Sequence, residues 1–210
     1  MKVLNLQQGS PEWLLEHSSR VTASRIQDGV LAKGRGGAES SGRRNYRAQI
    51  ACTILTGRPA KDRFRSQAME DGIEEEPFGR SSYEVLTGSM VDQVGFVIHP
   101  TMERAGASPD GLVGDKGCIQ IKCPYAATHI AWLLAGVVPE EHKPQMLWEM
   151  DSTERDWCDF VSYCSELPDN LQLFVVRFHR DEGKLREMRA EVKIFLNEVD
   201  ALVEKLKERK

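Results

Sequence analysis

The hydrophobic pattern of the chain changes period between Val91 and Tyr125, and this change constrains the fold more than any other feature. Apolar residues alternate from Val94 to Ile98, and a β-rich run from Cys118 to Lys122 follows a turn at Gly114 to Gly117. Alternation at every second position is typical of strands, whereas the segments on either side have helical spacing. We therefore expect the sheet of this protein to be built from this region.

Helix signals surround the predicted sheet. Ser10 before Pro11 is typical of a helix start, after which Trp13 and Leu14 are predicted to face inward, and Gly57 predicts a helix end. The predicted helices are 10–16, a start at 22–24, 45–56, 66–86, 128–134, 144–150 and about 184–208, and a predicted strand pair is 157–163 with 171–178.

Length and composition favour one soluble domain. A chain of 210 residues with 40% hydrophobic residues can bury one good core, so we expect a single domain spanning 1–210. No run of about 18 apolar residues and no signal-peptide pattern is present, which predicts a cytoplasmic protein without a membrane partner. The five cysteines form no CxxC pair and are expected to be free thiols.

The net charge of −4 conceals an uneven distribution. The segment from Arg20 to Arg65 has eleven basic and three acidic residues, a net of about +8, which leaves about −12 for the rest. Such a segment can attract phosphates, although its glycine-rich part, 33–44, is equally compatible with a solvated loop.

Three residues around the predicted sheet carry the chemistry. Asp110 precedes Gly111, and Gln120 and Lys122 lie two apart in the strand that follows, so they share a face that can converge on Asp110. Carboxylate oxygens and the Ile121 carbonyl suit a hard cation such as Mg²⁺, and an adjacent lysine can stabilise charge on a phosphate. The set indicates phosphodiester hydrolysis.

Pro109-Asp110 followed by Gln120-x-Lys122 resembles the PD-(D/E)xK nuclease signature, with one departure. The signature has Asp or Glu where this chain has Gln120. An amide keeps the shape and one metal-facing oxygen but loses the negative charge, so we expect weak metal binding and reduced turnover. Gln is also the change introduced to trap a nuclease with its substrate, so an engineered variant and a naturally divergent or inactive site both explain it.

Five segments in order resemble the phage lambda exonuclease (YqaJ-like) family, and together they extend from residue 8 to 153. These segments are Gln8 to Leu14, Val21 to Ser24, Glu76 to Tyr83, Ala107 to Pro124 with its two short motifs, and Gln145 to Thr153. The resemblance implies a restriction-endonuclease-like α/β fold with a central mixed sheet flanked by helices.

The resemblance also implies roles for single residues. Asp110, Gln120, Glu76 and the Ile121 carbonyl correspond to metal ligands, Lys122 to the catalytic lysine, and Gln145 to a partner of metal or water. Ser24 and Ser108 correspond to serines that hold the 5′ phosphate of the digested strand. The family's phosphate-binding arginine is replaced by His17, and Arg20 or Arg25 is expected to take its place.

At the level of activity, the resemblance implies 5′ to 3′ digestion of one strand of linear duplex DNA with Mg²⁺, or Mn²⁺, in phage-type recombination. It further implies a ring-shaped homotrimer, a single-strand annealing protein as partner, and the cytoplasm of a bacterial or phage-infected host. The 33–44 loop and the C-terminal helix are candidates for DNA or subunit contacts.

Two other functions stay open at this point: a restriction- or repair-type endonuclease with the same core, and a DNA-end-binding protein without catalysis. Each single residue also has an ordinary structural interpretation. Asp110 fits a turn, Glu76 fits an exposed helix face, and Ser24 and Gln145 fit helix caps.

Overall fold

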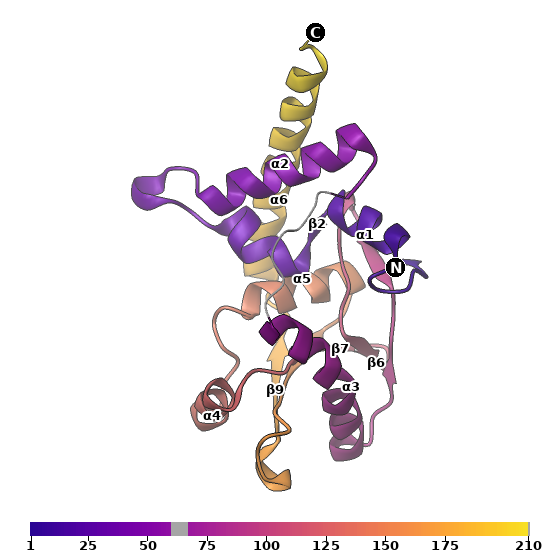
Figure 1. The fold of residues 1–210 in the computed structure, drawn as a ribbon, viewed down its shortest axis with the longest axis vertical. Coiled ribbons are helices and arrows are strands. Elements are labelled where there is room, and N and C mark those ends of the chain that lie inside the picture. Colours follow the sequence, from indigo (N-terminus) through magenta and orange to yellow (C-terminus); the bar gives the residue numbers. More distant parts are fainter. Residues whose placement is uncertain (60–66, 210) are drawn as a thin grey trace.

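The structure, a computed structural model, describes residues 1–59 and 67–209, and its helices surround two mixed β-sheets (Figure 1). The four-stranded sheet has the order β1-β4-β5-β2, and the five-stranded sheet has the order β3-β6-β7-β8-β9. The strands of the first sheet are β1 (Lys2–Leu4), β4 (Phe96–His99), β5 (Met102–Ala107) and β2 (Val21–Thr22). Those of the second are β3 (Val91–Asp92), β6 (Gly111–Val113), β7 (Gly117–Lys122), β8 (Trp157–Tyr163) and β9 (Leu173–His179).

Six α-helices are present in the described part of the chain, together with short 3-10 and π turns. The α-helices are α1 (Pro11–Ser18), α2 (Ser41–Thr56), α3 (Gln67–Thr87), α4 (Ala126–Ala135), α5 (Lys143–Thr153) and α6 (Glu182–Lys207). The short turns are η1 (Ala23–Arg25), η2 (Ile26–Leu31), η3 (Arg35–Gly37) and η4 (Asp169–Leu171).

The cap signals in the sequence predicted helix ends well. The Ser10 hydroxyl accepts a hydrogen bond of 3.1 Å from the Trp13 backbone N–H, and Pro11 occupies the first helical position. Gly57 ends α2 in the left-handed conformation with φ of 64°. The inward orientation predicted for Leu14 was wrong, since 37% of this residue is exposed whereas Trp13 is buried. The predicted start at Ser66 lies outside the described residues.

The predicted α/β fold class is confirmed, but the strands are divided between two sheets instead of one central sheet. The N-terminal strands β1 and β2 pair with β4 and β5, antiparallel and parallel respectively. The segment that follows, β6 to β9, forms the second sheet through the parallel pair β7 and β8 and antiparallel neighbours. These N-terminal partners are too short for their strand character to appear in the sequence.

Helix α5 joins the two sheets. It packs against β4 and β5 of the first sheet and β7 and β8 of the second, and it lies near the centre of the molecule (Figure 1). All its residues from Met146 to Thr153 are buried, which is rare for a helix with a polar sequence. Side chains on α5 can therefore reach the predicted catalytic strand from within the protein.

The long C-terminal helix α6 packs beside α2, and its end projects beyond the rest of the chain (Figure 1). One face of α6 is apolar and buried over most of its length, whereas Leu206 near its end is 39% exposed. The buried positions of α6 are Leu185, Met188, Val192, Phe195, Val199 and Val203.

Candidate active site

The pairing of β6 with β7 brings together the residues predicted to carry the chemistry. Gly111 lies opposite Ile119, so Asp110, one residue earlier, is beside Gln120. Asp110 Oδ2 accepts a 2.6 Å hydrogen bond from the Ile121 backbone N–H. Ile119 and Ile121 face a small core under α3, which leaves Gln120 and Lys122 on the opposite face of the strand.

The Gln120 amide group lies between the two oxygen atoms predicted to bind the metal. Its Nε2 donates hydrogen bonds to Asp110 Oδ2 and, at 3.2 Å, to the Ile121 carbonyl. Gln120 is almost fully buried, so both bonds are shielded from water. The Gln120 N–H₂ group thus forms hydrogen bonds with the same two oxygens, of Asp110 and Ile121, that are predicted to contact a cation.

Gln145 on α5 connects the side chains of this site. Its Nε2 donates to Gln120 Oε1 at 2.5 Å and to Glu149 Oε1 at 2.9 Å, and its Oε1 is 3.5 Å from Lys122 Nζ. Gln145 and Glu149 are four residues apart and therefore lie on the same helix face. The glutamine predicted from the family resemblance is thus placed at the centre of the site.

Electrostatics favour a cation in this region. Burial raises the pKa of Asp110 to about 7, Glu76 adds to the rise, and Lys122 opposes it. Burial also raises the pKa of Glu149 well above its ordinary value, with a further contribution from the negative charge of Asp110. Asp110 and Glu149 are both buried beside a single lysine, Lys122, so a bound cation would stabilise their charged forms.

Glu76 belongs to the same site although it comes from the other side of the sheet. It lies on α3, forms a salt bridge with Arg80 one turn later, and lines the cavity described next. Its proximity to Asp110 is evident from the effect on the pKa of that carboxyl group. The helix predicted to carry a further acidic residue therefore reaches the site.

A cavity of about 520 Å³ gives access to these residues. Its wall includes both serines expected to bind a 5′ phosphate, and the Ser108 hydroxyl accepts a 3.2 Å hydrogen bond from the Trp13 indole N–H. The residues that line the cavity and were predicted as site residues are His17, Ser24, Glu76, Ser108, Asp110, Gln120, Ile121, Lys122 and Gln145.

His17 occupies the position where the family resemblance implies a phosphate-binding arginine. Burial lowers the pKa of His17 to about 4, and the positive charge of Arg25 contributes, so His17 is neutral at physiological pH. Arg20 is bound by Glu16 and by the Glu103 carbonyl. Neither Arg20 nor Arg25 is among the described residues of the cavity wall, but the effect on His17 places Arg25 close to it.

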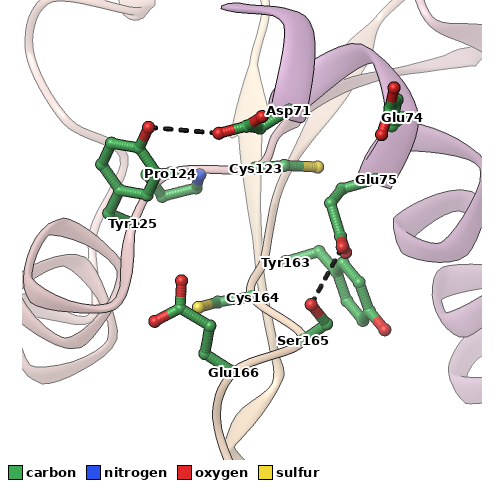
Figure 2. A pocket seen from close by; sticks show the side chains of 10 residues that line it. All are labelled: Asp71, Glu74, Glu75, Cys123, Pro124, Tyr125, Tyr163, Cys164, Ser165 and Glu166. Atoms are coloured by element: carbon green, nitrogen blue, oxygen red, sulfur yellow. Dashed lines mark hydrogen bonds between the residues drawn. The ribbon is translucent and has the colours of Figure 1, made fainter. Parts of the chain in front are cut away.

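A second cavity of about 320 Å³ adjoins the first and shares Cys123 and Pro124 with it. Figure 2 shows its carboxylates, among them Glu75, which accepts a 3.0 Å hydrogen bond from Ser165. The described lining contains no Lys or Arg. This acidic surface would repel phosphate groups. The acidic side chains are Asp71, Glu74, Glu75 and Glu166.

The donor atoms of the larger cavity fit a hard divalent cation. They comprise the Asp110 carboxylate, the Ile121 carbonyl, the Gln120 amide oxygen and the Glu149 carboxylate, all oxygen ligands. Among the described residues no group of three or more His, Cys, Asp or Glu is arranged to hold a metal. Amide and backbone oxygens would therefore have to complete the ligand set.

Glu149 is the residue that the sequence analysis missed. It stands in the run Met146-Leu147-Trp148-Glu149-Met150, where an acid among large apolar residues is unexpected. It follows Gln145 by four residues. That spacing was the available signal, because it puts both side chains on one face of the predicted helix.

Comparison with known proteins identifies the family. The model of the YqaJ-like viral recombinase domain matches residues 12–156, and this range includes every residue predicted to bind metal, water or phosphate. The chain belongs to the YqaJ-like viral recombinase domain family. No curated protein matches it.

Solved structures of exonucleases resemble this YqaJ-like chain. The alkaline exonuclease LHK-Exo from Laribacter hongkongensis is 42% identical, with a TM-score of 0.86 over 95% of this chain and 97% of that chain, and its complex with dAMP gives 0.87. A phage related exonuclease from Haemophilus somnus 129PT is 15% identical, with a TM-score of 0.68 over 89% and 96%, and supports the fold alone. The resemblance stated from sequence is confirmed.

Proposed function

We propose that this chain is a Mg²⁺-dependent 5′ to 3′ exonuclease that digests one strand of linear double-stranded DNA in phage-type recombination, with turnover reduced by Gln120. The observation that carries the proposal is the convergence of Asp110, Gln120, Lys122 and Gln145 in one cavity. Membership of the YqaJ-like family and similarity to an alkaline exonuclease support it. The complex of that exonuclease with dAMP fits a nucleotide as the released product.

The side chains of the site have distinct roles in this proposal. Lys122 stabilises the negative charge that develops on the scissile phosphate and orients the attacking water, and Gln145 holds the Lys122 ammonium in place. A divalent cation, when bound by Asp110 and its neighbours, would lower the pKa of water and support the leaving oxygen. Mn²⁺ is expected to substitute for Mg²⁺.

The serine side of the cavity is proposed to bind the 5′ phosphate. Ser24 and Ser108 offer hydroxyl groups, and the Trp13 indole fixes the Ser108 hydroxyl. His17 is neutral and cannot replace an arginine. Both Arg20 and Arg25 form ion pairs, with Glu16 and Asp28 respectively, and we favour Arg25 for phosphate binding because its charge acts on His17 of the cavity wall.

The test is the Gln120→Glu variant on linear duplexes with and without a 5′ phosphate. Restoring the carboxylate should raise Mg²⁺-dependent nucleotide release by about 100-fold, in the range seen when a charged group that stabilises a transition state is altered. Release should be faster from the phosphorylated end. Asn170→Asp makes the same amide-to-acid change at an exposed position away from this cavity, and as the matched control it should leave the rate unchanged.

A second function is favoured by one observation. The Gln120 amide already bonds to Asp110 and Ile121, which fits a protein that binds DNA ends without cutting them. If the chain binds 5′-phosphorylated ends and Gln120→Glu releases no nucleotides, the exonuclease proposal is refuted and the binding function stands. Cleavage of circular DNA would instead indicate a restriction- or repair-type endonuclease.

The assembly is also a proposal. Family resemblance suggests a homotrimeric ring around DNA, an annealing protein as partner, and action in the bacterial or phage-infected cytoplasm. The projecting end of α6 and the segment 33–44 are the candidate contact surfaces (Figure 1). In the described part of the chain, no helix is both long and apolar enough to cross a membrane.

A further inference from the structure

Glu149 is a completely buried glutamate among the oxygen donors of the larger cavity. One of its oxygens accepts a hydrogen bond from Gln145, and the other, Oε2, has no hydrogen-bond partner among the described residues. No Lys or Arg forms a salt bridge with it in the described part of the chain. A buried carboxyl group without a partner is costly, and such groups are uncommon unless they serve a function.

The location of Glu149 links it to the candidate active site. It lines the larger cavity, and the charged groups that act on it are Asp110 and Lys122. Gln120 and Glu149 are bound by the same atom: Gln145 Nε2 donates to Gln120 Oε1 at 2.5 Å and to Glu149 Oε1 at 2.9 Å. The two side chains thus present their oxygens to a common region.

We propose that Glu149 supplies the carboxylate that Gln120 lacks, so that Glu149 from α5 joins Asp110, the residue before β6, as an anionic ligand of the divalent cation. This inference rests on the proposed metal-dependent function and deepens it. The ligand that the family signature has on β7 is thus supplied by α5, which packs against β7.

The charge and geometry of the site support a carboxylate at position 149 in place of one at position 120. With Gln at 120 and Glu at 149, the site holds the same number of carboxylates as one with Glu at 120 and an amide at 149. For a cation to bind in this arrangement, the Gln120 amide has to rotate. Its N–H₂ group then turns away from Asp110 and Ile121, and its oxygen faces the cation instead. Gln145 can follow, since its own amide can rotate to keep a donor toward one partner and an acceptor toward the other.

The alternative is a structural role in which Glu149 stays protonated and only anchors Gln145. The two roles differ in what Glu149→Gln does. An amide at 149 has nearly the same shape and can still accept the hydrogen bond from Gln145, so a structural role predicts unchanged folding and unchanged cation binding. A ligand role predicts unchanged folding and lost cation binding.

The experiment measures Mn²⁺ binding to the full chain from the electron paramagnetic resonance signal of free Mn²⁺, without DNA. The parent should bind Mn²⁺, and Glu149→Gln should weaken binding by at least about tenfold, since altering even groups behind the ligands costs that much. Thermal unfolding by circular dichroism should show that Glu149→Gln stays folded. Glu166→Gln, in the adjacent acidic cavity, is the control for Mn²⁺ held there and should bind as the parent does (Figure 2).

The decisive variant exchanges the two groups. Gln120→Glu with Glu149→Gln returns the carboxylate to β7 while keeping the charge of the site, and it should restore Mn²⁺ binding to within about threefold of the parent, a difference of less than 1 kcal/mol. Loss of binding in Glu149→Gln together with restoration in the exchanged variant supports the proposal.

Two results would overturn it in distinguishable ways. If Glu149→Gln binds Mn²⁺ as tightly as the parent while Asp110→Asn does not, Glu149 is not a ligand and the metal-dependent function survives. If neither the parent nor Gln120→Glu binds Mn²⁺ or releases nucleotides, the metal-dependent function itself fails and Glu149 has no cation to hold.

Discussion

Asp151 and Glu149 are two buried carboxylates on the same helix in opposite surroundings. Asp151 is bound by His99 at 2.9 Å and by the guanidinium groups of Arg180 and Arg189, the latter at 2.7 Å. Burial alone would raise the pKa of Asp151, but hydrogen bonds from Arg189, His99 and Arg180 outweigh it and hold that pKa far below its ordinary value. Asp151 is thus a structural residue, whereas the side chain of Glu149 has only Gln145 as a hydrogen-bond partner among the described residues.

Asp151→Asn should lower the free energy of unfolding at pH 7 by about 3 kcal/mol, because it leaves two arginines and a histidine without their buried anion. A folded-state pKa below the unfolded value of about 3.9 contributes stability above that pH, and this stability is lost as the pH falls through the folded-state pKa. The difference between parent and variant in urea unfolding should therefore shrink below about pH 4. An equal difference at pH 7 and pH 3 would contradict this assignment.

At the scale of single residues, the sequence predicted those parts of the site that local spacing determines. Asp110, Gln120 and Lys122 could be predicted because side chains on a strand face the same side at every second residue. The short turn between β6 and β7 also sets the register of their pairing. Glu149 was not predicted, because its importance depends on what faces α5 across the core. Arg20 was named as a phosphate ligand from proximity in sequence, but its bonds to Glu16 and Glu103 could not be foreseen from sequence alone.

At the scale of elements, α6 stabilises a segment that leads to the cavity. Phe195 is fully buried and stacks on Tyr46 of α2 at 5.5 Å between ring centroids. The Tyr46 hydroxyl accepts a 3.0 Å hydrogen bond from the Thr22 backbone N–H and donates to the Arg20 carbonyl at 3.1 Å. The segment before Ser24 is therefore fixed by a contact that originates on the C-terminal helix.

Phe195→Ala should lower the free energy of unfolding by about 3 to 5 kcal/mol, as expected when a large aromatic side chain leaves a cavity in a core. Ile194→Ala is the matched control on the same helix; half of Ile194 is exposed, so the loss should stay below about 1 kcal/mol. Both values are obtained from urea unfolding followed by circular dichroism. Similar losses in the two variants would show that α6 is not anchored through Phe195.

Helices were predicted more reliably than sheet pairing, for a physical reason. A helix start or end depends on neighbouring residues such as Ser10, Pro11 and Gly57, whose effects are local. Sheet pairing joins distant segments: β1 pairs with β4 across 92 to 96 residues of chain, and β2 pairs with β5 across 84 residues. Strands of two or three residues have no detectable alternation, so the division into two sheets could not be predicted.

At the scale of the whole molecule, much of the basic segment is neutralised internally. Arg43 and Arg47 bind Glu198 of α6, and Arg20 and Arg25 bind Glu16 and Asp28. The part of the segment from 60 to 66 lies outside the described residues. Among those described, the basic residues of this segment without an ion pair are Lys33, Arg35, Arg44 and Arg58.

Arg44→Gln tests whether this remaining charge contributes to DNA binding. Arg44 is exposed near the start of α2, so the variant should weaken binding to a 5′-phosphorylated duplex and reduce the slope of log affinity against log salt by about 0.9. Fluorescence anisotropy at several salt concentrations measures both. Lys116→Gln removes an exposed charge at the opposite end of β7 from Lys122 and should leave the slope unchanged. Equal slopes in Arg44→Gln and the parent would place the DNA elsewhere.

The hydrogen bonds of Gln120 bear on whether folding precedes cation binding. In domains such as zinc fingers, metal binding supplies the free energy of folding, so folding and metal uptake are one process. Here an internal N–H₂ group, that of Gln120, bridges the Asp110 carboxylate and the Ile121 carbonyl. For the proposed metal-dependent function, we expect cation uptake to follow folding, because the ion would replace hydrogen bonds that the folded chain already makes.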